Sequence, residues 1–341
     1  MTSAKHTTYK SRKRPVLIIA AIVAFVAVFI LIFNIYRCSC LLKPGEFAEI
    51  TVDAGATVSS VGNDMERARL ILSSRELVDS INSKDAASKI KIGTYNFEGG
   101  KSVDEYADIL ISGSDAASPK IVVSEGMRLK DIADTVKNVS HNRISSSSFI
   151  EATKDASKYA SDYPFLKDAG NKSLEGFLMP KTYNYKASDK VEDIVRMMLD
   201  QFKLDTQDLD LSYPQSKNLN FYDVVILASI VEKESQPGVE KKVASVFYNR
   251  LAAHMQLNSD ATTAYYVGHD PSPEEVHADN AYSTYTNYGL PPTPICSPGL
   301  VAIDAVCHPE ETDYFFFFFK GNDYAFSKTF EEHQDNIVRL R

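Results

Sequence analysis

Two glutamates, Glu232 and Glu234, end a segment whose apolar residues recur at the spacing of an α-helix. The segment starts at Asn220, a residue that can cap a helix, and valine, leucine or isoleucine occupies positions 224, 227, 230 and 231 on one face. One further turn of this face reaches Glu234, while Glu232 points roughly to the opposite side.

A carboxyl group at the margin of an apolar core is costly to ionise, so its pKa rises. A raised pKa is what a general acid needs near neutral pH, and the pattern therefore selects Glu234 as a candidate catalytic acid. The alternative is that Glu234 is a solvated residue at the end of an ordinary helix, and this segment alone does not exclude it.

Periodic patterns on both sides of this segment predict an α+β chain. Helical spacing appears at residues 58–72, 103–111, from 129 onward, 191–202, 221–234 and 241–253. Strand patterns appear at residues 47–52, 90–97, 121–123 and 314–319. The last strand contains five consecutive phenylalanines, which are typical of a strand covered on both faces. We interpret them as core rather than as a ligand-binding surface.

These elements group into two parts. Residues 46–111 form a small β-α-β-α block that ends at a Ser-Gly-Ser linker, and residues 121–341 form a larger mixed α/β domain. A chain of 341 residues with 44% hydrophobic residues has enough apolar side chains for two cores.

An uncharged run of eighteen residues, VLIIAAIVAFVAVFILIF at 16–33, precedes both parts, and residues 34–36 extend it. That length is close to what a helix needs to cross the hydrocarbon core. Five basic and no acidic residues precede the run, so the positive-inside bias places residues 1–15 in the cytoplasm and the rest outside. We therefore predict a single-pass membrane helix at 16–36. A cleaved signal peptide is the alternative, but its apolar region is usually shorter and no A-x-A site follows.

The charge distribution bears on the partners of the chain. The formal net charge is -8, but the first 37 residues carry six basic and no acidic residues, which leaves 31 basic against 45 acidic residues elsewhere. Such an acidic body does not match a phosphate backbone, and we expect no nucleic-acid binding.

Four cysteines are too few for a disulfide-built scaffold. Cys38 and Cys40, beside the apolar run, could bridge two chains, and Cys296 and Cys307 could pair if the fold brings them together. Their spacing does not match the usual zinc sites, so we expect no metal and no cofactor.

Eight short motifs around the helix at 221–234 occur in the order in which a known family carries them. They are EGMRL at 125–129, EGFLMPKTY at 175–183, LASIVEKES at 227–235, VASVFYNRL at 243–251, LNSDAT at 257–262, YSTY at 282–285, GLPP at 289–292 and SPG at 297–299. Each is weak alone, but eight in register are specific. The chain resembles the MltG (YceG-like) endolytic murein transglycosylases from its apolar run to His333.

The resemblance implies a fold and a catalytic residue. Residues 46–111 would be a LysM-like subdomain and residues 121–341 a YceG-like catalytic domain. The essential glutamate of the family is the second one in its E-K-E-S segment, which is Glu234 here. Ser235 follows it, as a serine does at the end of the catalytic helix in other lytic transglycosylases.

The reaction implied by the resemblance is non-hydrolytic cleavage of the β-1,4 bond between N-acetylmuramic acid and N-acetylglucosamine of peptidoglycan, which leaves a 1,6-anhydro end. Glu234 would serve as acid and then as base, whereas ordinary glycosidases use two carboxylates. The implied partners are nascent glycan strands, whose elongation the enzyme would terminate, and the cell-wall synthesis machinery.

Further residues of the motifs are candidate substrate contacts: Glu175 and Asp260 for sugar hydroxyls or N-acetyl groups, Tyr183, Tyr282 and Tyr285 for aromatic or hydroxyl contacts, and Asn249, Thr262 and Thr284 for other polar contacts. The tyrosines could instead be half-buried packing residues, and Asn249 with Arg250 could brace a loop. We interpret His308 and His333 as structural.

The chain departs from the family pattern at three positions. Ala261 stands where proline is usual, and Ser283 and Ser297 stand where asparagines are common. The change at Ser283 shortens a side chain that could touch substrate. Two other functions stay open: a non-catalytic cell-wall-binding scaffold, and a hydrolytic muramidase with Asp260 or Glu175 as its second carboxylate.

Overall fold

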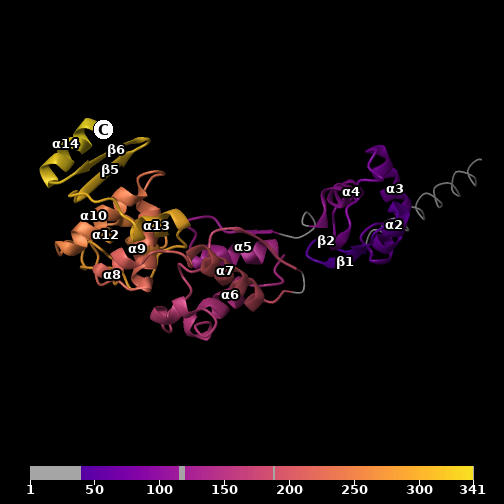
Figure 1. Cartoon of the computed structure of the whole chain (residues 1–341), viewed down its shortest axis with the longest axis horizontal. Helices are drawn as coiled ribbons and strands as arrows, with labels where there is room; N and C mark the ends of the chain where they lie inside the picture. Colours follow the sequence, from indigo (N-terminus) through magenta and orange to yellow (C-terminus); the bar gives the residue numbers. More distant parts are fainter. Residues whose placement is uncertain (1–39, 115–119, 187–188, 341) are drawn as a thin grey trace, which may run out of the picture. The chain divides into compact units, whose positions relative to one another are not determined.

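The computed structural model describes residues 40–114, 120–186 and 189–340. The chain divides into two compact units, residues 1–118 and 119–341, and each is considered by itself (Figure 1). The expected tail at 1–15 and membrane helix at 16–36 lie outside the described residues. Within the described ranges, no helix combines the length and the apolar character needed to cross a membrane.

The described part of the first unit contains one antiparallel pair of strands and three α-helices. Its elements are β1 (Phe47–Val52), α2 (Val58–Arg67), α3 (Ser74–Ser83), β2 (Gly93–Glu98) and α4 (Val103–Ser112). β1 and β2 pair from Phe47 opposite Glu98 to Val52 opposite Gly93. The unit has its own core, in which Tyr95, Phe97 and Tyr106 are fully buried. It can therefore hold its shape without contacts from elsewhere.

The expected β-α-β-α order of this unit was incomplete, because the structure has two helices between its strands. The helix predicted at 58–72 ends at Arg67, and Arg69 adopts a left-handed backbone with φ 61°. A non-glycine residue in that conformation stops an α-helix without any glycine to mark the place. α3 then buries only Leu77 and Ile81, and two apolar residues four apart are a weak helical signal.

The second unit is mainly helical and carries two small antiparallel pairs. β3 (Lys120–Val122) pairs with β4 (Thr182–Asn184), and β5 (Phe316–Lys320) pairs with β6 (Asp323–Ser327). Its α-helices are α5 (Leu129–Val139), α6 (Ser146–Thr153), α7 (Val191–Thr206), α8 (Ser212–Ser216), α9 (Phe221–Glu234), α10 (Glu240–Ala252), α11 (Asp260–Val267), α12 (Pro273–Val276), α13 (Leu300–Cys307) and α14 (Phe330–Leu340). The predicted α+β class is confirmed, with sheets of two strands each.

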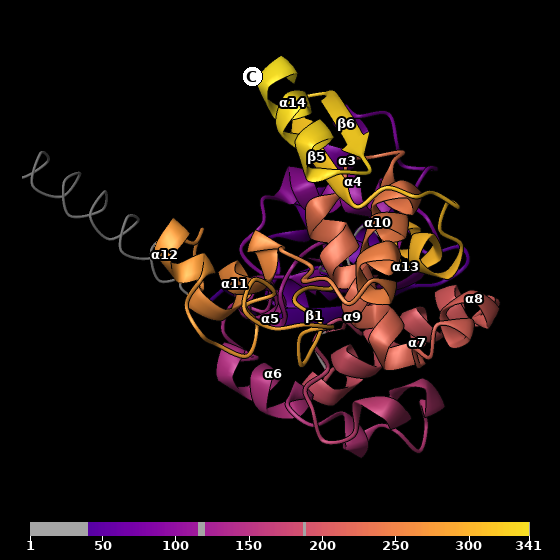
Figure 2. The ribbon, with the colours of Figure 1, turned by 90° about the vertical axis from the view of Figure 1, so that its left-hand side faces the viewer.

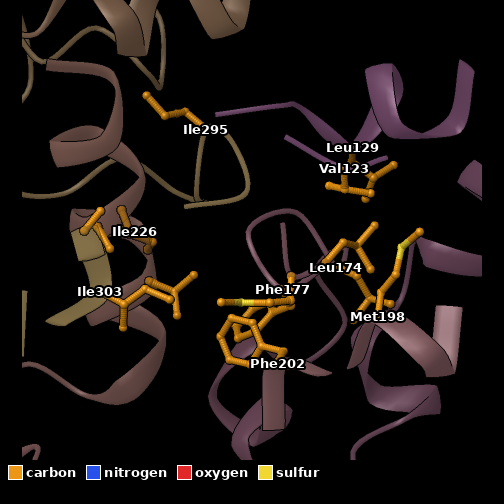
Figure 3. Close-up of a cluster of buried hydrophobic side chains, with 14 of the residues drawn as sticks. Val123, Leu129, Leu174, Phe177, Met198, Phe202, Ile226, Ile295 and Ile303 are labelled. Atoms are coloured by element: carbon orange, nitrogen blue, oxygen red, sulfur yellow. The ribbon is translucent and has the colours of Figure 1, made fainter. Parts of the chain in front are cut away.

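One continuous apolar core runs through the second unit. Its side chains come from segments far apart in the sequence, and Figure 3 shows Phe177 and Phe202 between Ile226 and Ile303 on one side and Leu174 and Met198 on the other. The rings of Phe177 and Phe202 lie 5.3 Å apart between centroids. Aromatic contacts of this kind add to the free energy gained by burying the rings.

Helix α9 passes through this core and packs against α10 and α13 (Figure 2). It begins with the predicted capping box, in which Asn220 and Asp223 each accept the other's backbone N–H at 3.0 Å. Every residue from Val224 to Val231 is buried, so the helix is apolar all round rather than along one stripe. The expected single apolar stripe, with a less apolar face opposite it, therefore understates the burial of this part of the helix.

The phenylalanine strand also differs from our prediction. β5 pairs only with β6, and Phe316, Phe317, Phe318 and Phe319 are all half-buried rather than enclosed on both faces. Residues of α14 contact both strands of this hairpin, and the hairpin and α14 form the end of the second unit drawn in yellow in Figure 1. A two-stranded hairpin has too few neighbours to bury a row of large rings.

Candidate active site

The C-terminal end of α9 opens into a cavity of about 520 Å³. This volume lies within the range of about 300–1,000 Å³ that is usual for small-molecule sites. The cavity is lined by Glu234, Arg250, Asn258, Asp260, Tyr285, Phe316, Phe317, Phe318, Phe319, Phe330 and His333. These residues come from α9, α10, α11, β5, α14 and the loops between them, so the site exists only in the folded second unit.

Glu234 is the last residue of α9 and reaches from the core into this cavity. Burial raises the pKa of its carboxyl group, and the negative charge of Asp260 raises it further. The hydroxyl of Ser259 donates to Glu234 Oε1 at 2.6 Å and, with the backbone N–H of Ala261, opposes that rise. The predicted position of Glu234 at the margin of the apolar core is therefore what the structure shows.

Ser259 is held in place by two buried threonines. Its backbone N–H donates to Thr284 Oγ1 at 2.9 Å, and its carbonyl accepts the hydroxyl of Thr262 at 2.8 Å. The two threonine hydroxyls lie 3.1 Å apart. Both threonines were predicted to touch substrate, but the structure buries them behind Ser259. They fix the hydrogen-bond donor of the acid instead.

Asp260 and Tyr285 form the polar rim of the cavity. The hydroxyl of Tyr285 donates to Asp260 Oδ1 at 2.7 Å, and both residues line the cavity beside Glu234. Asp260 is exposed at the first turn of α11, where the helix dipole favours a negative charge. Both side chains are open to a ligand, as the motif led us to expect.

Arg250 and Asn249 attach the C-terminal hairpin to α10. Asn249 donates to the carbonyls of Thr312 and Tyr314, both at 2.9 Å, so the structure gives it the loop-bracing role. The buried Arg250 donates to the carbonyls of Phe315 at 2.6 Å and Leu257 at 2.7 Å. Arg250 also lines the cavity, which the sequence had not led us to expect.

A second hollow is lined by residues that are next in the chain to two residues of the first. Lys233 and Ala261, the chain neighbours of Glu234 and Asp260, line a cavity of about 250 Å³. Arg128, Tyr265 and Gly268 line that cavity and also a third one of about 470 Å³. The second unit thus carries further hollows, which share no lining residue with the cavity of Glu234.

Glu175 lies in the third hollow, not beside Glu234. Its side chain is 3% exposed, and its two oxygens accept the N–H of Leu129 at 2.9 Å and the hydroxyl of Tyr265 at 3.1 Å. Burial raises its pKa to about 7. Because both oxygens already have protein partners, the expected contact with sugar hydroxyls is not what this geometry supports.

The predicted tyrosine contacts and Ser235 divide into three cases. Tyr183, on β4, is buried and its hydroxyl donates to the carbonyl of Met179, so it is a packing residue. Tyr282 is half-buried, lines the third hollow and shares a hydrogen bond of 2.8 Å with Thr293. Ser235 caps the end of α9 through its backbone N–H, which donates to Val231.

The three residues that depart from the family pattern are Ser283, Ser297 and Ala261, and the first two are buried. Ser283 is fully buried and donates to the carbonyl of Val276 at 2.8 Å, so our expectation that it could touch substrate was wrong. Ser297 is buried as well, and its hydroxyl has no hydrogen-bond partner among the described residues. Ala261 lines the second hollow.

Glu232 is less free than its position on the helix suggested. It is half-buried and accepts the backbone N–H of Gly299 at 3.0 Å, at the start of α13. Burial raises its pKa, and the charge of Glu125 raises it further. It does not line the cavity that holds Glu234.

Two further expectations concern metals and thiols. Cys296 and Cys307 are buried free thiols, and Cys40 is an exposed one, so no pairing occurs among these three. The described residues contain no group of histidine, cysteine and carboxylate side chains that could hold a metal ion.

His333 and the β5 phenylalanines are site residues that sequence reasoning missed. His333 comes from α14, its ring stacks on Phe316 with centroids 5.3 Å apart, and its Nδ1 is buried without a hydrogen-bond partner in the described chain. The aromatic density at 314–319 was visible in the sequence, but a strand pattern cannot show which neighbours cover a strand.

A desolvated carboxyl at the end of a buried helix, open to a cavity with polar and aromatic walls, is an arrangement typical of enzymes that use acid–base catalysis. Comparison with known proteins gives the family. The chain belongs to the YceG-like family, whose sequence pattern matches residues 50–339.

Individual relatives are similar over most of this chain. An endolytic murein transglycosylase of Bacillus subtilis (strain 168) is 29% identical over 313 residues, which are 86% of each protein. One of Streptococcus pneumoniae (strain ATCC BAA-255 / R6) is 28% identical over 326 residues, 86% of this chain but 58% of the relative. The crystal structure of a YceG-like protein from Listeria monocytogenes matches with a TM-score of 0.58 and 27% identity, over 85% of this chain and 99% of that one.

Proposed function

We propose that this chain is an endolytic peptidoglycan lytic transglycosylase with Glu234 as its catalytic acid and base. The observation that carries the proposal is the setting of Glu234: its pKa is raised by burial, and its carboxyl faces the cavity at the end of α9. The endolytic murein transglycosylases among its relatives supply the substrate and the reaction.

The first step is proton donation. Because burial favours the neutral form, Glu234 enters the reaction protonated, and with Ser259 donating to Oε1 the proton sits on Oε2. It passes to the glycosidic oxygen between the muramic acid and glucosamine rings as the bond from that oxygen to C1 breaks. The Glu234 carboxylate that results is stabilised by the hydroxyl of Ser259 and by the N–H of Ala261.

The second step returns the proton. The carboxylate takes a proton from the C6 hydroxyl of the muramic ring while O6 bonds to C1, which closes the 1,6-anhydro ring. No water is consumed, and Glu234 ends protonated as it began. Because the substrate supplies the nucleophile, one carboxyl is enough, unlike in ordinary glycosidases. The cavity of Glu234 and the hollow lined by its chain neighbour Lys233 would receive the strand on either side of the cleaved bond, as endolytic cleavage requires.

The test compares two matched amide variants. Glu234→Gln keeps the shape of the side chain but cannot give or take the proton, so turnover falls by at least about 10²–10⁴-fold. Glu232→Gln keeps an oxygen for the N–H of Gly299 and stays active within a small factor. Products of digested peptidoglycan are identified by mass spectrometry, since anhydro and reducing ends differ by one water.

Four outcomes of this test are possible. Anhydro ends that depend on Glu234 support the proposal. Reducing ends instead would mean a hydrolytic muramidase, with Asp260 in the same cavity as the second carboxylate. A folded Glu234→Gln variant that still releases anhydro ends would remove Glu234 from the mechanism, and absence of any cleavage by the native chain would favour a wall-binding scaffold.

We further propose that residues 16–36 anchor the chain in the cell membrane, with residues 1–15 in the cytoplasm and the enzyme outside it. The one-sided basic cluster before the apolar run supports this topology. A reporter fused after residue 60 should be active only outside the cytoplasm. A mature protein that begins near residue 38 would instead indicate a cleaved signal.

We propose a glycan-holding role for the first unit and a place for the enzyme beside the wall-synthesis machinery. Residues 46–111 would act as a LysM-like subdomain that holds glycan near the enzyme, and the independent core of this unit is compatible with such a separate role. Acting on nascent strands, the enzyme would end their elongation beside the wall-synthesis machinery.

A further inference from the structure

Four consecutive phenylalanines of β5, Phe316 to Phe319, line the cavity that holds Glu234. None of them is fully buried, although phenylalanine is among the residues that gain most from burial. A row of half-buried rings beside a catalytic carboxyl needs an explanation other than the core of the fold.

The four rings divide by the alternation of a strand. Phe317 and Phe319 pack against the apolar core of the second unit, and the Phe317 ring lies 5.8 Å from that of Phe247. These two fasten the strand to the enzyme. Phe316 and Phe318 belong to the other face, where Phe316 contacts Phe330 and His333 of α14.

Phe318 is the least engaged of the four. Ring contacts are recorded for Phe316, Phe317 and Phe319, but none for Phe318 within the described ranges of the chain. Its side chain is half-buried and lines the cavity. A ring that is fixed by its strand, pairs with no other aromatic ring of the described chain and is partly exposed at the cavity can present a face to a ligand.

Polar side chains surround this aromatic wall. Arg250 places its guanidinium 5.2 Å from the centre of the Phe316 ring and binds the carbonyl of Phe315 at 2.6 Å, which ties the start of the strand to the site. Asn258 and Asp260 are exposed on the cavity rim. Hydrogen-bonding groups around an apolar wall are what a ligand with apolar faces and a polar edge would require.

A pyranose ring has this chemistry, because its axial C–H bonds form an apolar face and its hydroxyl and N-acetyl groups project from the edge. We propose that β5 is the aromatic wall of a sugar-binding subsite next to the cleaved bond, with Phe318 as its principal contact. This inference rests on the proposed function, because the ligand is taken to be the glycan on which Glu234 acts. A lipid or a plain apolar peptide would leave the charged rim unpaired.

The experiment uses the full-length chain and a short soluble glycan, an uncrosslinked peptidoglycan tetrasaccharide. Phe318→Leu keeps an apolar side chain but loses the aromatic face, so KM rises roughly two- to tenfold, the size expected for one aromatic contact, while kcat changes less than twofold. Phe318→Trp restores a face and returns KM to the native range. Tyr324→Ala, an exposed aromatic of β6 outside the cavity, is the matched control and leaves KM unchanged.

Thermal unfolding of each variant is measured alongside. If Phe318→Leu unfolds at the native temperature and its KM equals that of the native chain, the inference is wrong. It is also wrong if Tyr324→Ala raises KM as much as Phe318→Leu does, because the effect would then come from the hairpin as a whole. If Phe318→Leu is unstable, the Phe318→Trp variant provides the test instead. The subsite proposal is wrong if Phe318→Trp is as stable as the native chain but its KM is raised as much as that of Phe318→Leu.

A second measurement separates this inference from the proposed function. The Glu234→Gln chain is labelled with fluorinated phenylalanine, and the Phe318 signal is assigned by its loss in Phe318→Leu. A shift of that signal when the tetrasaccharide is added supports the subsite even if no anhydro ends are ever formed. Anhydro ends from the native chain without any such shift would support the function and overturn the subsite.

Discussion

The buried carboxyl of Glu175 makes a quantitative prediction about the pH dependence of stability. Replacing it by glutamine preserves its shape and both hydrogen bonds: the amide oxygen can accept the N–H of Leu129, and the amide nitrogen can donate to the hydroxyl oxygen of Tyr265. What the substitution removes is the ability to ionise inside the core. The variant therefore isolates the effect of that single charge.

The magnitude follows from proton linkage. Burial raises the pKa of Glu175 from 4.5 to about 7, so between these values the unfolded chain loses its proton while the folded chain keeps it. A group with a raised carboxyl pKa costs stability as pH rises, and the cost is complete above the folded pKa. Since each pKa unit corresponds to about 1.4 kcal/mol, the native chain loses about 3 kcal/mol of unfolding free energy from this group.

The assay is denaturant unfolding of the second unit's helices, followed by circular dichroism of the full chain from pH 4.5 to pH 8. Native and Glu175→Gln chains should be about equally stable at the acid end, and the variant should become more stable by up to about 3 kcal/mol above pH 7. Glu331→Gln, an exposed change of the same charge, is the control and should not alter the pH slope. Parallel curves for native and Glu175→Gln chains would refute the reasoning.

The remaining predictions concern activity. Ser259→Ala removes the donor that lowers the pKa of Glu234, so the alkaline limb of the rate–pH profile moves to higher pH and turnover falls by about tenfold or more. Ser283→Ala, which changes an equally buried serine away from Glu234, is the control. If the alkaline limb of the Ser259→Ala variant does not move, Ser259 does not set the pKa of Glu234. Deleting residues 46–111 should lower cleavage of polymeric wall far more than cleavage of short soluble glycans, and equal losses would mean that this unit helps to form the cleft.

The position of the acid could be predicted because the signal was local. Asn220 and Asp223 form the expected capping box, and the apolar residues of α9 lead to Glu234 at the edge of the core. Helix periodicity, capping and the burial of one end are all contained in fifteen consecutive residues. The E-K-E-S segment of the family resemblance pointed to the same glutamate.

The partners of that acid could not be predicted, because they depend on contacts between distant segments. Ser259 lies 25 residues from Glu234, and it is oriented by Thr284, another 25 residues on. Both threonine motifs were noticed, but a motif shows that a residue matters and not whether it faces ligand or protein. Because Thr262 and Thr284 are buried, they contact the protein rather than a ligand.

The phenylalanine strand was misjudged for a related reason. A run of large apolar residues indicates a strand with apolar surroundings, but the sequence does not state how many strands and helices surround it. In β5 the neighbours are β6 on one edge and parts of α10 and α14, which leaves the rings half-covered. The same local pattern therefore fits a buried central strand and an aromatic wall of a cavity.

The burial of α9 links the stability of the second unit to its chemistry. Leu227 and Val231 are fully buried on the two turns before Glu234, and the same exclusion of water that stabilises this core raises the pKa of the carboxyl. A smaller residue at Val231 would cost unfolding free energy and would also admit water towards the acid. The core of the second unit and the raised pKa of Glu234 thus depend on the same helix.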